Sequence, residues 1–169
     1  KAYSLRSLWK IIFQKSELCC KLADYSDDLV SLMQVEHAEV AHAASGVLQS
    51  IINRISQHWA NRILRTGCHA TIELLVRFGN DADIVDNAAA ILAFLKFKSP
   101  GLWYNIAAAP ATRDKVILLA VPLLETHLNT ARVVHRLLRL LELYKPWREL
   151  PIPRGNIDQL ARRAQETHP

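Results

Sequence analysis

The sequence repeats itself at an offset of 44 residues. Segments 38–51 and 82–95 carry apolar side chains at matching positions, with a spacing typical of a helix that buries one face. The matching pairs are Val40/Ile84, Ala44/Ala88, Val47/Ile91, Leu48/Leu92 and Ile51/Leu95. A period between about 20 and 50 residues indicates a stack of similar helical units, each burying its apolar face against the next.

A third, weaker copy spans 130–141, and its register is open to a shift of a few residues. Shorter helices are predicted before each long one, at 17–23, 28–33, 61–66, 70–78 and 113–120, and a further helix is expected to begin near Pro122. Gly67 is expected to end the helix at 61–66, because glycine is common just after the last helical residue. Ser99-Pro100-Gly101 is expected to separate the second unit from the third.

The composition predicts an all-α protein. Half of the 169 residues are hydrophobic, only five are glycine, and apolar and polar residues nowhere alternate as they do in a strand. We expect one repeat domain over 1–145, in which 5–13 is the last helix of a preceding, incomplete unit. Prolines interrupt the start of the remaining segment, 146–169, so we expect a tail there with one short helix at 156–165.

The charge and the cysteine content indicate which partners and which cellular compartment to expect. The net charge of +5 is spread along helices, which indicates at most a weak preference for acidic partners. Three cysteines without a C-x-x-C spacing indicate reduced thiols and an intracellular protein, cytoplasmic or nuclear. The apolar runs are shorter than the ~18 residues that a membrane span needs.

Catalytic and metal-binding patterns are weak. Cys19, Cys20 and the Cys68-His69 pair are the only candidates for zinc, and their spacing does not match a ligand pair. The seven histidines are scattered, and neither a nucleophile motif nor a phosphate-binding glycine loop is present in the sequence. We therefore expect neither an enzyme nor a cofactor.

The repeated segments resemble the armadillo repeat, with HEAT repeats as a close alternative. The resemblance covers about residues 17–144 and depends on the copy at 61–95, on its Leu74-Leu75-Val76 core and on Val121-Pro122-Leu123-Leu124. It implies a right-handed α-solenoid of about three repeats whose third helices line a concave groove. Members are mostly non-enzymatic scaffolds or adaptors that bind proteins or extended peptides.

The resemblance also argues against binding of nuclear-localisation peptides. Peptide-binding members hold the peptide backbone with an asparagine, and some add a tryptophan four residues earlier in the same helix. Ser50 and Phe94 stand at the asparagine positions here, and Gly46 and Ala90 stand at the tryptophan positions.

The alignment assigns one lane of residues on each third helix to the groove. Its candidate binding residues are His42, Ser50, Arg54, Asp86, Phe94, Lys98, Arg132, Arg136 and, in the shifted register, Arg139. Because a guanidinium matches a carboxylate in geometry, we expect the arginines to favour an acidic partner segment, with Phe94 as an apolar anchor. The plainer interpretation is an ordinary solvated face.

Two other interactions stay open. The arginines at 132, 136, 139, 162 and 163 are the basis of an alternative function, binding of RNA or an anionic lipid surface, although nucleic acid is the less favoured partner at this charge. Trp9 and Phe13 lie four residues apart and favour either dimerisation or contact with further repeats.

Overall fold

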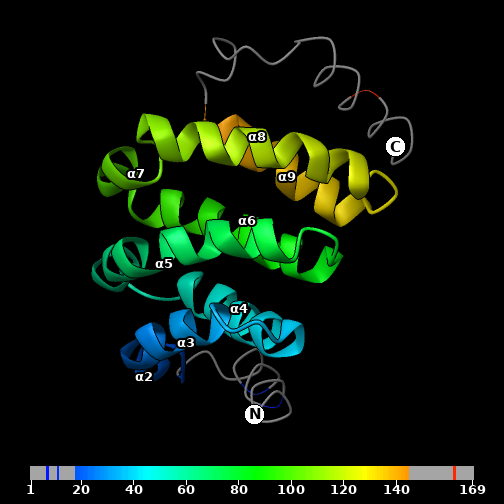
Figure 1. Ribbon diagram of the computed structural model, residues 1–169. Coiled ribbons are helices and arrows are strands. Elements are labelled where there is room, and N and C mark those ends of the chain that lie inside the picture. The colour runs from blue at the N-terminus through cyan, green and yellow to red at the C-terminus, as the bar shows by residue number, and fades with distance from the viewer. Residues whose placement is uncertain (1–6, 8–10, 12–17, 145–161, 163–169) are drawn as a thin grey trace.

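The protein is all-helical wherever its structure is described. A computed structural model (Figure 1) describes residues 7, 11, 18–144 and 162. The elements in order are α2 (Leu18–Leu22), the 3-10 helix η1 (Ala23–Tyr25), α3 (Ser26–Met33), α4 (Ala38–Ile52), α5 (Gln57–Arg77), α6 (Ala82–Lys98), α7 (Pro100–Ile106), α8 (Pro110–Thr126) and α9 (Ala131–Leu143).

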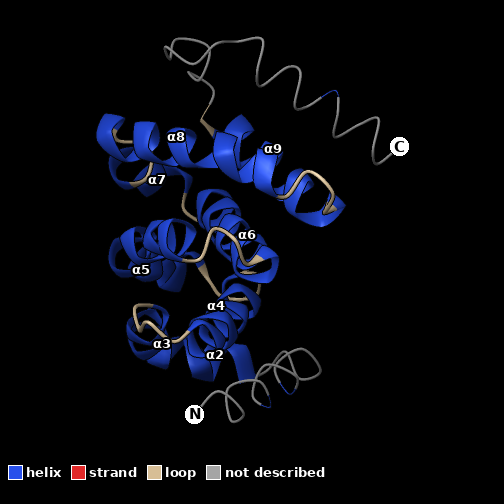
Figure 2. Cartoon of the chain, turned by 45° about the vertical axis from the view of Figure 1, so that its right-hand side comes forward, coloured by secondary structure: helices blue, strands red, loops and turns tan. Residues whose placement is uncertain are grey.

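The helices lie in two layers. Helices α3, α5 and α8 form one column in Figure 2, and α4, α6 and α9 form the other. Helix α6 packs between α4 and α9, and these are among the most extensive contacts in the molecule. Helices α3 and α4, α5 and α6, and α8 and α9 pack together as successive pairs. The second layer therefore carries the three long segments that repeat in the sequence.

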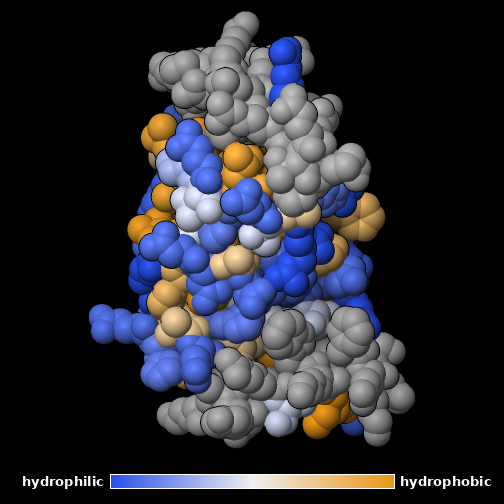
Figure 3. Space-filling model, turned by 90° about the vertical axis from the view of Figure 1, so that its right-hand side faces the viewer, coloured by the Kyte–Doolittle hydropathy of each residue, from blue (hydrophilic) through white to orange (hydrophobic). Residues whose placement is uncertain are grey.

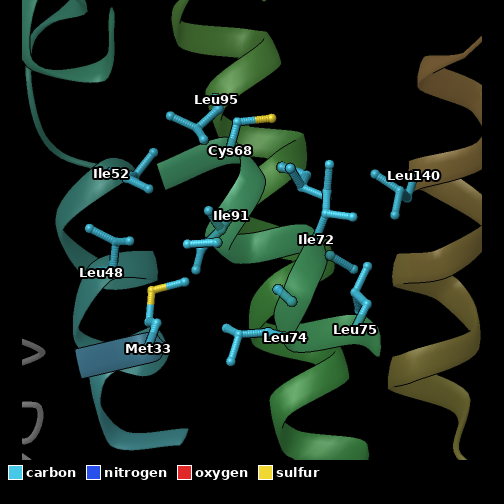
Figure 4. Packing of buried hydrophobic residues seen from close by; sticks show 14 of the residues in the cluster. Met33, Leu48, Ile52, Cys68, Ile72, Leu74, Leu75, Ile91, Leu95 and Leu140 are labelled. Atoms are coloured by element: carbon cyan, nitrogen blue, oxygen red, sulfur yellow. The ribbon is translucent and has the colours of Figure 1, made fainter. Parts of the chain in front are cut away.

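The repeated apolar stripe forms the core. Four of the five matched pairs are fully buried, and in the fifth Ile84 is buried while Val40 is partly exposed. Figure 4 shows how Leu48 and Ile52 of α4, Ile91 and Leu95 of α6 and residues of α5 meet in one cluster. The prediction of a helix face buried at this spacing is confirmed.

Polar contacts join each helix pair to the next at separations close to the sequence repeat. The Nη atoms of Arg77 donate to the carbonyl oxygens of Met33, Gln34 and Val35, which end α3, at 2.6, 2.9 and 3.1 Å. His127 Nε2 lies 2.6 Å from Gly79 O, and Lys96 Nζ donates to Leu143 O at 2.8 Å. These contacts span between 42 and 48 residues.

The predicted break at Gly67 is wrong. Gly67 lies inside the continuous helix α5 and is buried. A Cβ on this residue would lie 3.0 Å from Val30 Cγ2, so the glycine lets α5 approach α3 closely. The helices expected at 61–66 and 70–78 are therefore one helix.

The third helix pair also differs from the prediction. Pro122 begins no new helix but lies inside α8, on its exposed side. Proline has no backbone N–H, so one carbonyl of the preceding turn lacks its helical donor, and water can reach it there. Pro100, expected as a separator, occupies the first turn of the additional helix α7, a position that suits its fixed φ. Helix α7 buries Trp103 against Tyr144, with ring centroids 5.7 Å apart.

Several predictions lie outside the described residues. They concern most of the helix at 5–13 with Trp9 and Phe13, the tail from residue 146, its helix at 156–165 and Arg163. Of these segments only Ser7, Ile11 and Arg162 are described, and each is helical.

Candidate binding hollow on the layer of α4, α6 and α9

A hollow of about 430 Å³ opens on the layer formed by α4, α6 and α9. The residues that line it all carry polar or charged groups: His42 and Gln49 from α4, Asp83, Asp86 and Asn87 from α6, and Arg132 from α9. The three helices begin on the right of Figure 1, and Figure 3 shows that hydrophilic residues cover much of the described part of that side. The hollow is thus built from the three helices of one layer.

The start of α6 is fixed by its cap. Asp81 Oδ1 accepts hydrogen bonds from the backbone N–H groups of Asp83 at 3.0 Å and Ile84 at 3.1 Å. Such a side-chain cap satisfies N–H groups that otherwise lack an intrahelical partner. Asp83, Asp86 and Asn87 follow within the first two turns at helical spacing, so the capped end places them on one side of α6.

Asp86 is the buried charge of the site. Its side chain is only 9% exposed. Arg132 Nε lies 3.2 Å from Oδ2, and Arg136 Nε lies 3.4 Å from Oδ1. Arg132 also pairs with Asp83 at the exposed rim. Two carboxylates and two guanidinium groups therefore balance, and the ion pairs join α6 to α9.

A hydrogen-bonded link joins α6 to α4. Asn87 Nδ2 donates to Ser45 Oγ at 3.2 Å, and Ser45 Oγ donates to the backbone oxygen of His42 at 2.9 Å. Both side chains are buried, where an unmade hydrogen bond would cost about 1–3 kcal/mol. This link places the residues of α4 beside the start of α6.

The structure gathers only part of the predicted lane. His42, Asp86 and Arg132 line the hollow, and Arg136 stands next to them through its pair with Asp86. Arg139 is exposed on α9 but does not line the hollow.

The remaining lane residues lie toward the other ends of the helices. Ser50 is half-buried and donates to Gly46 O at 3.0 Å, and Arg54, which follows α4, lies with Nη1 3.9 Å from Cys19 Sγ. Phe94 and Lys98 occupy the last turns of α6, outside the hollow. The positions between the two groups, Gly46, Ala90 and Leu140, are buried, so the lane is not one continuous open groove.

Three residues of the hollow were not among the predicted ones: Gln49, Asp83 and Asn87. Asp83 lies one turn before Asp86 and Asn87 directly after it, so the polar residues in the first two turns of this helix were the available signal for these two. The repeat alignment did not select these residues because it considered only every fourth position along each of the repeated helices.

Two carboxylates of the other layer have perturbed pKa values. A hydrogen bond from Arg62 lowers the pKa of Asp27, and a hydrogen bond from Lys115 lowers the pKa of Glu73. The first pair joins α3 to α5 and the second joins α5 to α8. These two ion pairs join the helices of the layer that lies opposite the hollow.

Neither a metal cluster nor a membrane helix is present in the part of the chain that the structure describes. No three His, Cys, Asp or Glu side chains there converge as metal ligands would, and Cys19 and Cys68 are buried while Cys20 is exposed. None of the described helices combines the length and the apolar character that crossing a bilayer requires.

Comparison with known proteins yields no relative. No protein-family model, curated protein or solved structure matches this chain.

Proposed function

We propose that this chain is a non-enzymatic scaffold, a right-handed α-solenoid of about three armadillo-type or HEAT-type repeats, that binds a segment of a protein partner across α4, α6 and α9. The observation that carries the proposal is the polar hollow built from these three helices. Helical stacks typically bind partners along an extended surface to which each repeat contributes the same face.

The packing order supports the repeat interpretation. Each long helix contacts the next one, and bonds between neighbouring helix pairs recur at separations near the sequence offset of 44 residues. The first and third groups contain three α-helices each, α2–α4 and α7–α9, with the 3-10 helix η1 in the first; in the second group α5 spans both of the predicted shorter helices. Helix α5 packs closely on α3 at Gly67, and the two layers keep the same order of helices.

The ion pairs change the expected basis of recognition. Arg132 and Arg136 hold Asp83 and Asp86, so they offer less unbalanced positive charge to an acidic partner than the sequence suggested. The preference for an acidic segment now depends on Arg139, which forms no ion pair within the described part of the chain. The same pairing reduces support for RNA or anionic lipid, because paired guanidinium groups release few counterions.

The test is a peptide-display selection against the purified protein, followed by affinity measurements with two charge-reversal variants. Arg139→Glu alters the proposed face on α9, and Arg65→Glu alters another exposed arginine on α5, in the other layer. We expect an acidic peptide to lose at least about five-fold in affinity with Arg139→Glu and less than two-fold with Arg65→Glu, which corresponds to about 1 kcal/mol of coupling.

The outcomes separate the candidate functions. Peptides that bind the two variants equally would move the binding site away from α9. The alternative function is binding of RNA or an anionic lipid surface. It would be favoured over the scaffold if no peptide is enriched and if the protein binds RNA or anionic vesicles with an affinity that falls steeply with salt.

A further inference from the structure

We propose that residues 156–165 of the chain cover the apolar outer side of the last helix pair, α8 and α9. The inference goes beyond the proposed function, because it does not depend on what α4, α6 and α9 bind. We call this outer side the end face, and we define it by Ile117 and Val121 of α8 and by Val134, Leu138 and Leu141 of α9.

On α8 the end face points away from the preceding helix pair. Lys115 pairs with a glutamate of α5, and Leu123 lies against Gly79 at the end of α5, so these two positions mark the side of α8 that faces α5. At about 100° of rotation per residue, Ile117 and Val121 lie on the opposite side of the helix.

The same holds for α9. Arg132 and Arg136 pair with carboxylates of α6 and so mark the side of α9 that faces α6. Val134, Leu138 and Leu141 lie on the opposite side, at about 100° per residue. In the two preceding pairs the corresponding side is covered by the next pair, as α6 covers α4 and α9 covers α6.

The end face has no such helix pair to cover it, because α9 is the last element whose span the structure describes. Its side chains are nevertheless buried, as Ile117, Val134 and Leu141 are, or half-buried, as Val121 and Leu138 are. The terminal unit of a helical stack normally has a polar outer face, and this outer face is apolar. The end face therefore needs a cover that is apolar toward α8 and α9 and polar toward water.

Residues 156–165 have the pattern of such a cover. Ile157, Leu160, Ala161 and Ala164 follow the spacing of one helix face, and polar or charged residues occupy all the other positions. Arg162, which falls on the polar side of this pattern, is helical and exposed. The segment can thus place its apolar stripe on the end face and leave its polar side in water.

The connection is long enough for the segment to reach the end face. Residues 145–155 join α9 to the segment and span up to about 36 Å when fully extended, at ~3.3 Å per residue. Helix α9 has 13 residues and is about 20 Å long. A segment tethered at this distance also has a high effective concentration at the end face, which favours it over a second copy of the chain.

The experiment measures where the segment lies in the full chain. A nitroxide spin label is attached at Arg162→Cys in a Cys20→Ser background, since Cys20 is exposed while Cys19 and Cys68 are buried. The methyl groups of isoleucine, leucine and valine carry ¹³C. We expect the label to broaden the methyl signals of the end face and to leave those of Val30 in α3, at the other end of the stack (Figure 1), unchanged. No broadening at the end face, or equal broadening at Val30, would overturn the inference.

A matched pair of variants tests the apolar stripe. Leu160→Asp places a carboxylate on the stripe, where burial without a partner is costly, and Gln159→Asp places the same group one residue away on the polar side. Leu160→Asp should abolish the broadening of the end-face signals, and Gln159→Asp should retain it. Retention in both variants, or loss in both, would contradict docking through the stripe.

A mixed sample distinguishes the chain's own segment from a second copy. Spin-labelled protein without ¹³C is mixed with ¹³C-labelled protein without the spin label, so that only contacts between molecules broaden the signals. We expect no broadening of the end-face signals in this mixture. Broadening as strong as that within one molecule would assign the end face to a second copy and overturn the inference.

Discussion

Gly79 is the position where adding one methyl group should damage the structure most clearly. It lies between α5 and α6, and a Cβ there would stand 2.7 Å from Leu123 Cδ2 and 2.9 Å from the backbone oxygen of Leu75. Both distances are shorter than side chains tolerate, and a backbone oxygen inside a helix cannot turn away as a side chain can. Gly79→Ala must therefore shift the Leu123 side chain and the backbone at the end of α5.

The expected cost follows from two opposing effects. Overpacking a buried contact costs about 1–3 kcal/mol, while replacing glycine by alanine gains about 0.4–1 kcal/mol by restricting the unfolded chain. The net prediction is a loss of about 1–2 kcal/mol in the free energy of unfolding. For a chain of this length that corresponds to a decrease of about 2–8 °C in the melting temperature. The displacement also strains the contact between Gly79 O and His127 Nε2.

The same substitution at Gly101 is the matched control. A Cβ there meets no atom within 4 Å, and the residue lies in α7, so Gly101→Ala should stabilise by about 0.5–1 kcal/mol. Urea unfolding followed by circular dichroism gives both values, provided that the slope m is unchanged. A Gly79→Ala variant as stable as Gly101→Ala would refute the close contact between α5 and α8.

Three further predictions address the remaining contacts. Arg77→Met removes the guanidinium that donates to three carbonyl groups at the end of α3, and it should lower the free energy of unfolding in urea by about 1–2 kcal/mol. A variant of unchanged stability would show that water fully replaces the lost donor. Because the pKa of Asp27 is lowered, the stability from its pair with Arg62 is present above the unfolded pKa near 4 and is lost as the pH falls through the folded pKa. Asp27→Asn should thus cost up to ~1 kcal/mol at pH 7 and progressively less as the pH falls below about 4, and a pH-independent difference would contradict the pairing. Burial raises the pKa of the Cys68 thiol to about 11, so iodoacetamide at pH 8 should modify Cys20 rapidly and Cys68 only after unfolding, as mass spectrometry of the digested protein would show; rapid labelling of Cys68 in the folded chain would refute its burial.

The apolar stripe was predictable because it is a local property of one helix. Its spacing identifies which side chains are buried without reference to the neighbouring helix, as Val47 and Ile91 illustrate. The continuation of α5 through Gly67 and of α8 through Pro122 was not predictable in the same way. Local propensity favours a break at both, but contact with Val30 keeps Gly67 inside α5, and solvent exposure makes the proline in α8 tolerable.

The hollow depends on a quantity that the sequence repeat does not contain, the sliding of one helix along the next. Asn87 meets Ser45 across 42 residues, whereas Arg132 meets Asp83 across 49 residues, so the two interfaces of α6 have different registers. A single offset of 44 residues predicts neither pairing. The contacts of α6 with α9 span longer separations, 47 residues for Lys96 and Leu143 and 49 for Arg132 and Asp83, and they place the arginines of α9 alongside Asp83 and Asp86. The register of α9 against α6 therefore decides whether the arginines of α9 present free positive charge or are neutralised by carboxylates of α6. In this chain the arginines at 132 and 136 are paired, and the hollow is close to neutral.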